Sequence, residues 1–208
     1  YRKQDLKRRI STSPQLDSVS EAMSRLGRAL ARFHNQPGKG EFTFHADGVI
    51  SKIRRYSLEL KEYGVNPGYL NSIVEKLGNY EGFTVSTQAS INLKGFDVRQ
   101  VFIDDSDCLY LLDPGKMKDG YREVDLARFI VTCRILYWGS TAIFFHLAPN
   151  RSYEESFLTG YYGDDKGGGK ILRILIIKEL FKHWRMAGFT LEKRPWSLTR
   201  KRFLTKVY

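Results

Sequence analysis

Two oxygen-bearing side chains, Gln100 and Asp113, stand at the two ends of a short segment with the pattern of a β-hairpin. Gln100 enters the first predicted strand, and Asp113 leaves the second strand on a Pro-Gly turn. Because the start of one strand lies beside the end of the other in a hairpin, the amide and the carboxylate are expected to meet at one rim. Two hard oxygens suit Mg²⁺ that carries a nucleotide phosphate. An ordinary hairpin with polar ends is the alternative that these residues leave open.

The elements that would position these side chains follow from the spacing of apolar residues. Apolar runs at 101–103 and 109–112 flank the polar turn 104–107, which predicts a hairpin. Helical spacing begins at Glu123, and a further carboxylate, Asp125, lies close to the start of that helix.

Other helices are predicted by the same spacing and by capping patterns. A capping box at residues 18–21 opens the first helix, and its apolar face is closed by His34, which we interpret as a core or helix-end histidine. The Gly- and Pro-rich residues 35–40 are expected to end it. Further helices are expected near residues 47–60, 66–77, 152–161 and 170–187, with Gly188 ending the fourth and Ser197 starting a last one.

The order of these blocks resembles the catalytic core of the aminoglycoside phosphotransferase-like kinases, the small-molecule relatives of protein kinases. Residues 26–34, Leu-Gly-Arg-Ala-Leu-Ala-Arg-Phe-His, are similar to the family's Leu-Gly-x-x-Leu-Ala-x-Leu-His helix. Residues 156–161 are similar to its Phe-Leu-x-Gly-Tyr helix. Residues 125–127, Asp-Leu-Ala, match the helix whose Asp braces the catalytic loop. Gln100 falls at the metal-binding Asn, and Asp113 at the second metal-binding carboxylate.

The resemblance implies a Mg²⁺-ATP site that lacks the family's catalytic Asp. Gln100 and Asp113 would hold Mg²⁺ and, through it, ATP. The family's catalytic Asp, which accepts the proton of the substrate hydroxyl, falls at Gly95, which has no side chain to act as a base. The His-Gly before it is replaced by residues 93–94, Leu-Lys. Asp97 is the nearest carboxylate and the candidate for the catalytic role.

The fold implied by the resemblance is α+β, the mainly helical C-terminal lobe of a protein-kinase-like fold with a small catalytic-loop β-hairpin. We assign residues 18–208 to this lobe and residues 1–17 to a linker or arm. The family's N-terminal lobe carries a Gly-rich phosphate-covering loop and a phosphate-binding Lys. We expect it to be absent from this chain, because fewer than 25 residues precede the first matching helix.

Composition narrows the class of protein and the class of partner. The 208 residues carry a net charge of +11, concentrated toward the two ends, which suits a nucleotide, a nucleic acid, an anionic lipid surface or a phosphorylated sugar. Solvated basic helix faces are the alternative. Cys108 and Cys133 lie in apolar stretches, so buried reduced thiols and a cytoplasmic protein are expected. No apolar run approaches the ~20 residues that span a bilayer.

Three functions remain open at this point. The first is an ATP-dependent phosphotransferase acting on a hydroxyl of a sugar, an aminoglycoside or another saccharide, with Asp97 as base or orienting group. The second is a pseudokinase that keeps the fold as a binding or scaffold module, because Gly95 replaces the catalytic Asp. The third is a helical protein that binds RNA or an anionic surface through its basic ends.

Overall fold

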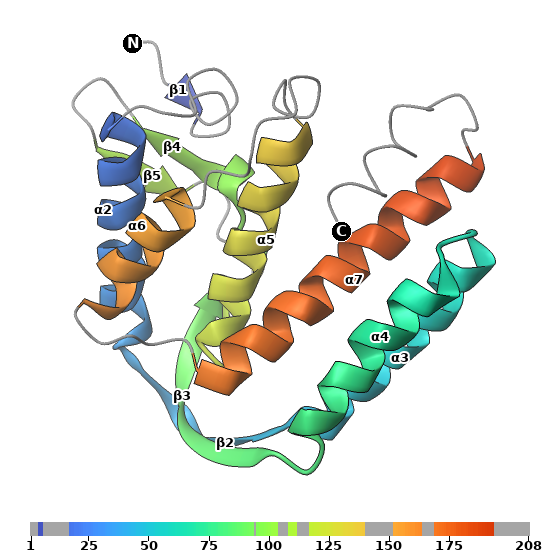
Figure 1. Ribbon diagram of the computed structural model, residues 1–208. Helices are drawn as coiled ribbons and strands as arrows, with labels where there is room; N and C mark the ends of the chain where they lie inside the picture. Colours follow the sequence, from blue (N-terminus) through green and yellow to red (C-terminus); the bar gives the residue numbers. More distant parts are fainter. Residues whose placement is uncertain are drawn as a thin grey trace. The chain divides into compact units, whose positions relative to one another are not determined.

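The structure is a computed structural model, and it describes residues 4–5, 17–93, 95–103, 108–111, 117–139, 152–163 and 169–193 (Figure 1). The chain divides into two compact units. The first contains residues 1–42 and 88–168, and the second contains residues 43–87 and 169–208. Helices dominate both units and small antiparallel sheets accompany them, so the α+β class predicted from the sequence is confirmed.

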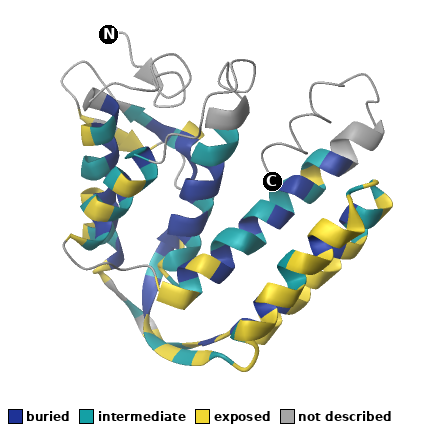
Figure 2. Cartoon of the chain, in the orientation of Figure 1, coloured by how far each residue is buried: buried dark blue, intermediate teal, exposed yellow. Residues whose placement is uncertain are grey.

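The helices of the first unit are α2 (Asp17–His34), α5 (Glu123–Gly139) and α6 (Ser152–Tyr162), as the apolar spacing predicted. Helix α5 is apolar over most of its circumference and is mostly buried in Figure 2. Helices α2 and α6 pack closely along their lengths. The core of this unit is built from large apolar side chains of all three helices, namely Val19, Met23, Leu26, Leu30, Leu126, Phe129, Ile130 and Phe157.

The predicted hairpin is present. Strand β4 (Val101–Ile103) pairs antiparallel with β5 (Leu109–Leu111), and Val101 lies opposite Leu111. A two-residue strand, β1 (Gln4–Asp5), adds to the other edge of β4, which gives the order β1-β4-β5. The predicted arm therefore contributes one short strand to this sheet. The turn at 104–107 lies outside the described residues.

A second sheet has the order β2-β3-β6. It consists of β2 (Pro37–His45), β3 (Thr84–Leu93) and β6 (Met117–Gly120), and β2 and β3 each contribute residues to both units. Helix α2 ends at His34, as the Gly- and Pro-rich residues 35–40 predicted, but β2 already begins at Pro37 within them. Gly38 shows why, because a Cβ at this position would lie 2.8 Å from the carbonyl oxygen of Ala89 in β3. The glycine permits two backbones to approach, and it does not mark a loop.

The second unit contains α3 (Ala46–Glu62), α4 (Pro67–Leu77), the short 3₁₀ helix η1 (Gly78–Tyr80) and α7 (Gly169–Lys193). Helices α3 and α7 pack together, and α4 packs on α3. The expectation that Gly188 ends the last of these helices was wrong, because α7 continues to Lys193.

Tight packing explains that glycine too. A Cβ at Gly188 would lie 2.5 Å from Cδ2 of the Tyr63 ring, so the glycine makes room for an aromatic side chain at the end of α3. The start of α4 was predicted correctly, because the Asn66 side chain accepts a hydrogen bond from the backbone N–H of Gly68 at 2.8 Å.

The prediction that both cysteines are buried was wrong for Cys108, which is exposed. It directly precedes β5, an edge strand whose Tyr110 and Leu111 are also exposed, so this apolar run borders solvent. Cys133 on α5 is partly buried. None of the helices in the described part of the chain combines the length and apolarity needed to cross a membrane.

Candidate functional site

The segment between β3 and β4 is clamped to helix α5 by hydrogen bonds at two points. At its start, the backbone N–H of Leu93 donates to Oδ2 of Asp125 at 2.7 Å, and this pair is buried. Further along, the N–H of Val98 donates to Oγ1 of Thr132 at 3.4 Å. Asp125 therefore supports this loop, as the sequence resemblance predicted.

An aromatic stack holds the middle of the same loop. The ring of Phe96 stacks on Phe129 of α5 with centroids 5.1 Å apart, and Phe129 contacts Phe157 of α6 at 4.5 Å. All three side chains are buried. Aromatic pairs of this kind add about 0.5–1.5 kcal/mol beyond the burial of their surface. The loop is thus anchored in the core of its unit, which leaves its polar side chains in defined positions.

Gly95 has a backbone conformation that other residues rarely adopt, with φ at +96°. A Cβ at Gly95 would meet, among the described atoms, only Nε2 of Gln100, at 3.8 Å. A side chain at this position would therefore point toward the Gln100 amide. The position that the resemblance gave to the catalytic Asp faces the predicted metal ligand, but here it carries no carboxylate.

Gln100 ends the short 3₁₀ helix η2 (Val98–Gln100), one residue before β4. Its Oε1 atom is buried and accepts no hydrogen bond from the described residues. A buried amide oxygen without a donor is costly unless a ligand completes it. This oxygen therefore fits the role of a Mg²⁺ ligand, as a hard neutral donor.

The second predicted ligand, Asp113, lies outside the described residues. Within the described ranges, no three His, Cys, Asp or Glu side chains gather into a metal-binding group. The assignment of Gln100 and Asp113 to one metal site therefore stays a prediction.

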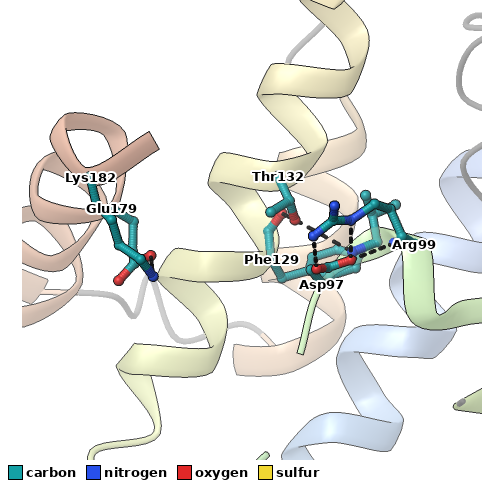
Figure 3. A network of polar contacts seen from close by, with 7 residues as sticks. Asp97, Arg99, Phe129, Thr132, Glu179 and Lys182 are labelled. Atoms are coloured by element: carbon teal, nitrogen blue, oxygen red, sulfur yellow. Dashed lines mark hydrogen bonds and ion pairs between the residues drawn. The ribbon is translucent and has the colours of Figure 1, made fainter. Parts of the chain in front are cut away.

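Asp97 is buried and forms a two-pronged ion pair with Arg99, as Figure 3 shows. Its Oδ1 accepts from the backbone N–H of Arg99 at 2.8 Å and from Nε at 3.1 Å, and its Oδ2 accepts from Nη2 at 2.6 Å. Burial alone would raise the pKa of Asp97. The hydrogen bonds and charge of Arg99, with the charge of Arg128, outweigh burial and hold that pKa below its ordinary value.

This environment defines what Asp97 can do chemically. An ionised carboxylate with a lowered pKa is a weak proton acceptor near neutral pH, but it can orient a hydroxyl by accepting its hydrogen bond. It also caps η2 through the Arg99 N–H. The catalytic role of Asp97 stays a prediction. The ion pair with Arg99 was not predicted, although an Arg two residues after an Asp is well placed to pair with it.

The sequence did not predict that His34, Asp125 and Tyr161 form one hydrogen-bond network behind the loop. His34 of α2 is buried, with Nε2 3.2 Å from Oδ2 of Asp125 and Nδ1 2.7 Å from the hydroxyl of Tyr161 on α6. The interpretation of His34 as a core histidine is confirmed, but its partners could not be named. His34 and Tyr161 lie at the ends of the two segments that resemble family helices. In each segment a polar residue follows the apolar residues of one helix face, and this pattern could have identified the two residues in the sequence.

No protein-family model matches the sequence, and no curated protein matches it. Solved structures of glucosamine kinase match the fold. One crystal form gives a TM-score of 0.60 at 13% identity, covering 97% of this chain and 55% of that one. Another gives 0.57 at 15% identity. A complex with glucosamine, ADP and inorganic phosphate gives 0.53 at 13% identity.

These likenesses show that the chain has a fold similar to part of glucosamine kinase, in agreement with the kinase-like fold expected from the sequence. The chain spans about half of the length of these structures, with 52–55% of them covered. The more specific resemblance to aminoglycoside phosphotransferases rests on the sequence motifs alone.

Proposed function

We propose that this chain is the helical lobe of a phosphotransferase that uses Mg²⁺-ATP and acts on a hydroxyl group of a sugar, an aminoglycoside or another saccharide. The observation that carries the proposal is the match of 97% of the chain to glucosamine kinase at a TM-score of 0.60. The motifs shared with the aminoglycoside phosphotransferase-like kinases support it independently of the fold. Residues 18–208 would form this lobe.

Gln100 and Asp113 are the residues that would hold the metal. The unsatisfied Oε1 of Gln100 supports the first assignment, and the position of Asp113 after β5 supports the second. Mg²⁺, when bound, would neutralise charge on the phosphates. Asp97 would orient the substrate hydroxyl by accepting its hydrogen bond, which requires that Arg99 share the carboxylate or move away.

A second function, a pseudokinase that binds nucleotide or a partner without transferring phosphate, is favoured by two observations at the loop. Gly95 has no side chain where the family has its base, and its φ of +96° would strain an Asp placed there. Both carboxylate oxygens of Asp97 are already engaged by Arg99. Phosphoryl transfer without a positioned base relies on orientation and charge alone.

Calorimetric titration of ATP into the 208-residue chain, with and without Mg²⁺, tests the shared part of both functions. We expect Mg²⁺-dependent binding that is lost in Asp113→Ala and weakened at least tenfold in Gln100→Ala. Asn71→Ala is the matched control, because it removes an exposed amide from α4 in the other unit. Absence of ATP binding to the wild-type chain would contradict the phosphotransferase and the nucleotide-binding pseudokinase, and it would leave only a pseudokinase that binds a partner.

Transfer of ³²P from ATP to glucosamine and to an aminoglycoside then separates the two functions. The phosphotransferase predicts a labelled product and a fall in kcat in Asp97→Asn. The pseudokinase predicts ATP binding without product for the wild type.

A further inference from the structure

The buried network behind the loop connects four elements of the first unit through one carboxylate oxygen. Oδ2 of Asp125 on α5 receives the N–H of Leu93, the last residue of β3, at 2.7 Å. The same oxygen lies 3.2 Å from Nε2 of His34 on α2. Nδ1 of His34 lies 2.7 Å from the hydroxyl of Tyr161 on α6. The side chains of His34 and Asp125 are 1% and 2% exposed, so water does not compete for these bonds.

For an ionised Asp125 and a neutral His34, each hydrogen bond of the network has one possible direction. An ionised carboxylate only accepts, so Nε2 of His34 must carry the hydrogen that points to Asp125. In the neutral imidazole Nδ1 is then the acceptor, and the Tyr161 hydroxyl donates to it. The chain of donors runs from Tyr161 through His34 to Asp125, and the N–H of Leu93 is the fourth member. Tyr161 therefore orients the ring that orients the carboxylate.

The helices that carry Tyr161 and His34 cannot shift independently. A Cβ at Gly160, next to Tyr161, would lie 2.1 Å from the carbonyl oxygen of Ser24 on α2, so the two backbones are in direct contact. At the far end of the network, Leu93 lies two residues before Gly95 and starts the path that leads to Gln100. Tyr161 is thus joined to the start of the loop by three consecutive hydrogen bonds.

We propose that His34 and Tyr161 are positioning residues that act through Asp125 to hold Leu93, at the start of the segment that carries Asp97 and Gln100. The part of this proposal that concerns catalysis rests on the phosphotransferase function proposed above. The part that concerns the loop conformation does not, because it can be measured without nucleotide.

Hydrogen exchange of the full chain, read at the Leu93 amide, tests the conformational part. Tyr161→Phe keeps the buried ring and removes only the donor, and we expect Leu93 to exchange about tenfold faster, as for the loss of one hydrogen bond. Thr159→Val is the matched control, because it removes an exposed hydroxyl from the same helix, and Leu93 should exchange as in the wild type.

Substitutions of His34 provide a rescue experiment. His34→Gln keeps an N–H donor for Asp125, so the protection of Leu93 should stay within about threefold of the wild type, whereas His34→Leu should lose it tenfold or more. If Leu93 stays protected in both Tyr161→Phe and His34→Leu, the proposal is wrong. A uniform rise in exchange over α2, α5 and α6 would also contradict it, since it would indicate general destabilisation.

Steady-state kinetics test the catalytic part. Tyr161→Phe should lower kcat several-fold and change the KM for ATP less than twofold, because the network shapes the loop and touches no nucleotide. A wild-type chain without any turnover would contradict the phosphotransferase function and leave the exchange result standing. Unchanged kcat in Tyr161→Phe, in a chain whose wild type is active, would overturn the positioning role alone.

Discussion

At the scale of single residues, two buried aspartates near the same loop have different tasks. Asp125 has only a backbone amide and a histidine as hydrogen-bonding partners among the described residues, and it fixes the start of the loop. Asp97 is paired with the half-exposed guanidinium of Arg99. The partners, and not the residue type, determine which carboxylate stabilises structure and which could meet a substrate.

The lowered pKa of Asp97 predicts how stability depends on pH. A carboxylate whose pKa is lower in the folded state stabilises that state above its ordinary pKa of 3.8, and this contribution is lost as the pH falls through the folded value. Asp97→Asn should lower the unfolding free energy by about 1–2 kcal/mol at pH 7, with the difference shrinking below pH 4. Urea denaturation at both pH values measures it, with Glu155→Gln, which changes an exposed carboxylate on α6, as control. A difference that grows on acidification would contradict the assigned ion pair.

The two cysteines predict a difference in thiol reactivity. Burial raises the pKa of the Cys133 thiol well above its usual value, and the nearby charges of Glu154 and Asp97 raise it further. Cys108 is exposed. Titration with a thiol-reactive disulfide at pH 8 should therefore show one fast phase that disappears in Cys108→Ser, and a second phase at least tenfold slower. Equal rates for the two thiols would show that α5 does not protect Cys133.

At the scale of elements, glycines in two helices permit the close packing of α2 against α6. A Cβ at Gly27 would lie 2.2 Å from the carbonyl oxygen of Phe157, and one at Gly160 would lie 2.1 Å from that of Ser24. Real Cβ contacts are never this short, so any side chain would force the helices apart. These glycines belong to the two segments that resemble family helices, and in this chain each is required for steric reasons.

Gly27→Ala and Gly160→Ala should each destabilise the protein by about 2 kcal/mol or more, although alanine favours a helix by about 1 kcal/mol over glycine. Gly48→Ala on α3 is the control, because a Cβ there meets no atom within 4 Å. It should leave stability unchanged or raise it by up to about 1 kcal/mol. Thermal unfolding with a fluorescence probe compares all three. A stabilising Gly27→Ala would mean that α2 and α6 are not in backbone contact.

Gly188 of α7 offers a test in which the sign of the effect should reverse. Gly188→Ala should cost about 1 kcal/mol or more, since its Cβ would overlap the Tyr63 ring. In a Tyr63→Ala background the overlap is gone, so the same change should stabilise by up to about 1 kcal/mol through helix propensity. A double-mutant cycle by urea denaturation measures the coupling. If the two changes are additive, the predicted contact does not exist.

At the scale of the whole molecule, the net charge of +11 is unevenly distributed along the chain. Residues 43–87 contain five lysines and arginines and five acidic residues, whereas residues 194–208 contain five basic residues and no acidic one. Part of the charge of α7 is offset within its own unit. Lys178 and Lys182 pair with the buried Glu179 at 2.6 and 2.9 Å, and Arg185 pairs with Glu59.

This distribution predicts salt-dependent binding of polyanions through the C-terminal end. The wild-type chain should bind heparin at low ionic strength, with log K falling linearly as log salt concentration rises. Lys201→Glu with Arg202→Glu should reduce the slope by about two. Lys52→Glu with Arg55→Glu, in the charge-balanced segment, is the matched control and should change it less. Binding that persists unchanged at 0.5 M salt would point to a specific site in place of general attraction.

The sequence alone determined the features that depend on near neighbours along the chain. The period of apolar residues predicted α2, α3, α4, α5 and α6, the capping Asn66 predicted the start of α4, and two apolar runs predicted the β4–β5 hairpin. The departures at Gly95 and Gln100 were also visible, because a residue type can be compared with a motif without any coordinates. These features predicted the α+β class and the kinase-like fold.

Only the tertiary structure decided what depends on contacts between distant segments. Gly38 and Gly188 have the sequence pattern of helix or loop ends, but each lies where another element approaches too closely for a Cβ. The sequence did not show whether Asp97 is free to bind a substrate or is paired with Arg99. The pairing depends on the turn of η2, which brings the Arg99 guanidinium to the Asp97 carboxylate. The links from Tyr161 through His34 to Asp125 join residues 91 and 127 positions apart. Local sequence patterns cannot predict such contacts, because hydrogen bonds and steric exclusion act between residues that are close in space and can be far apart in the chain.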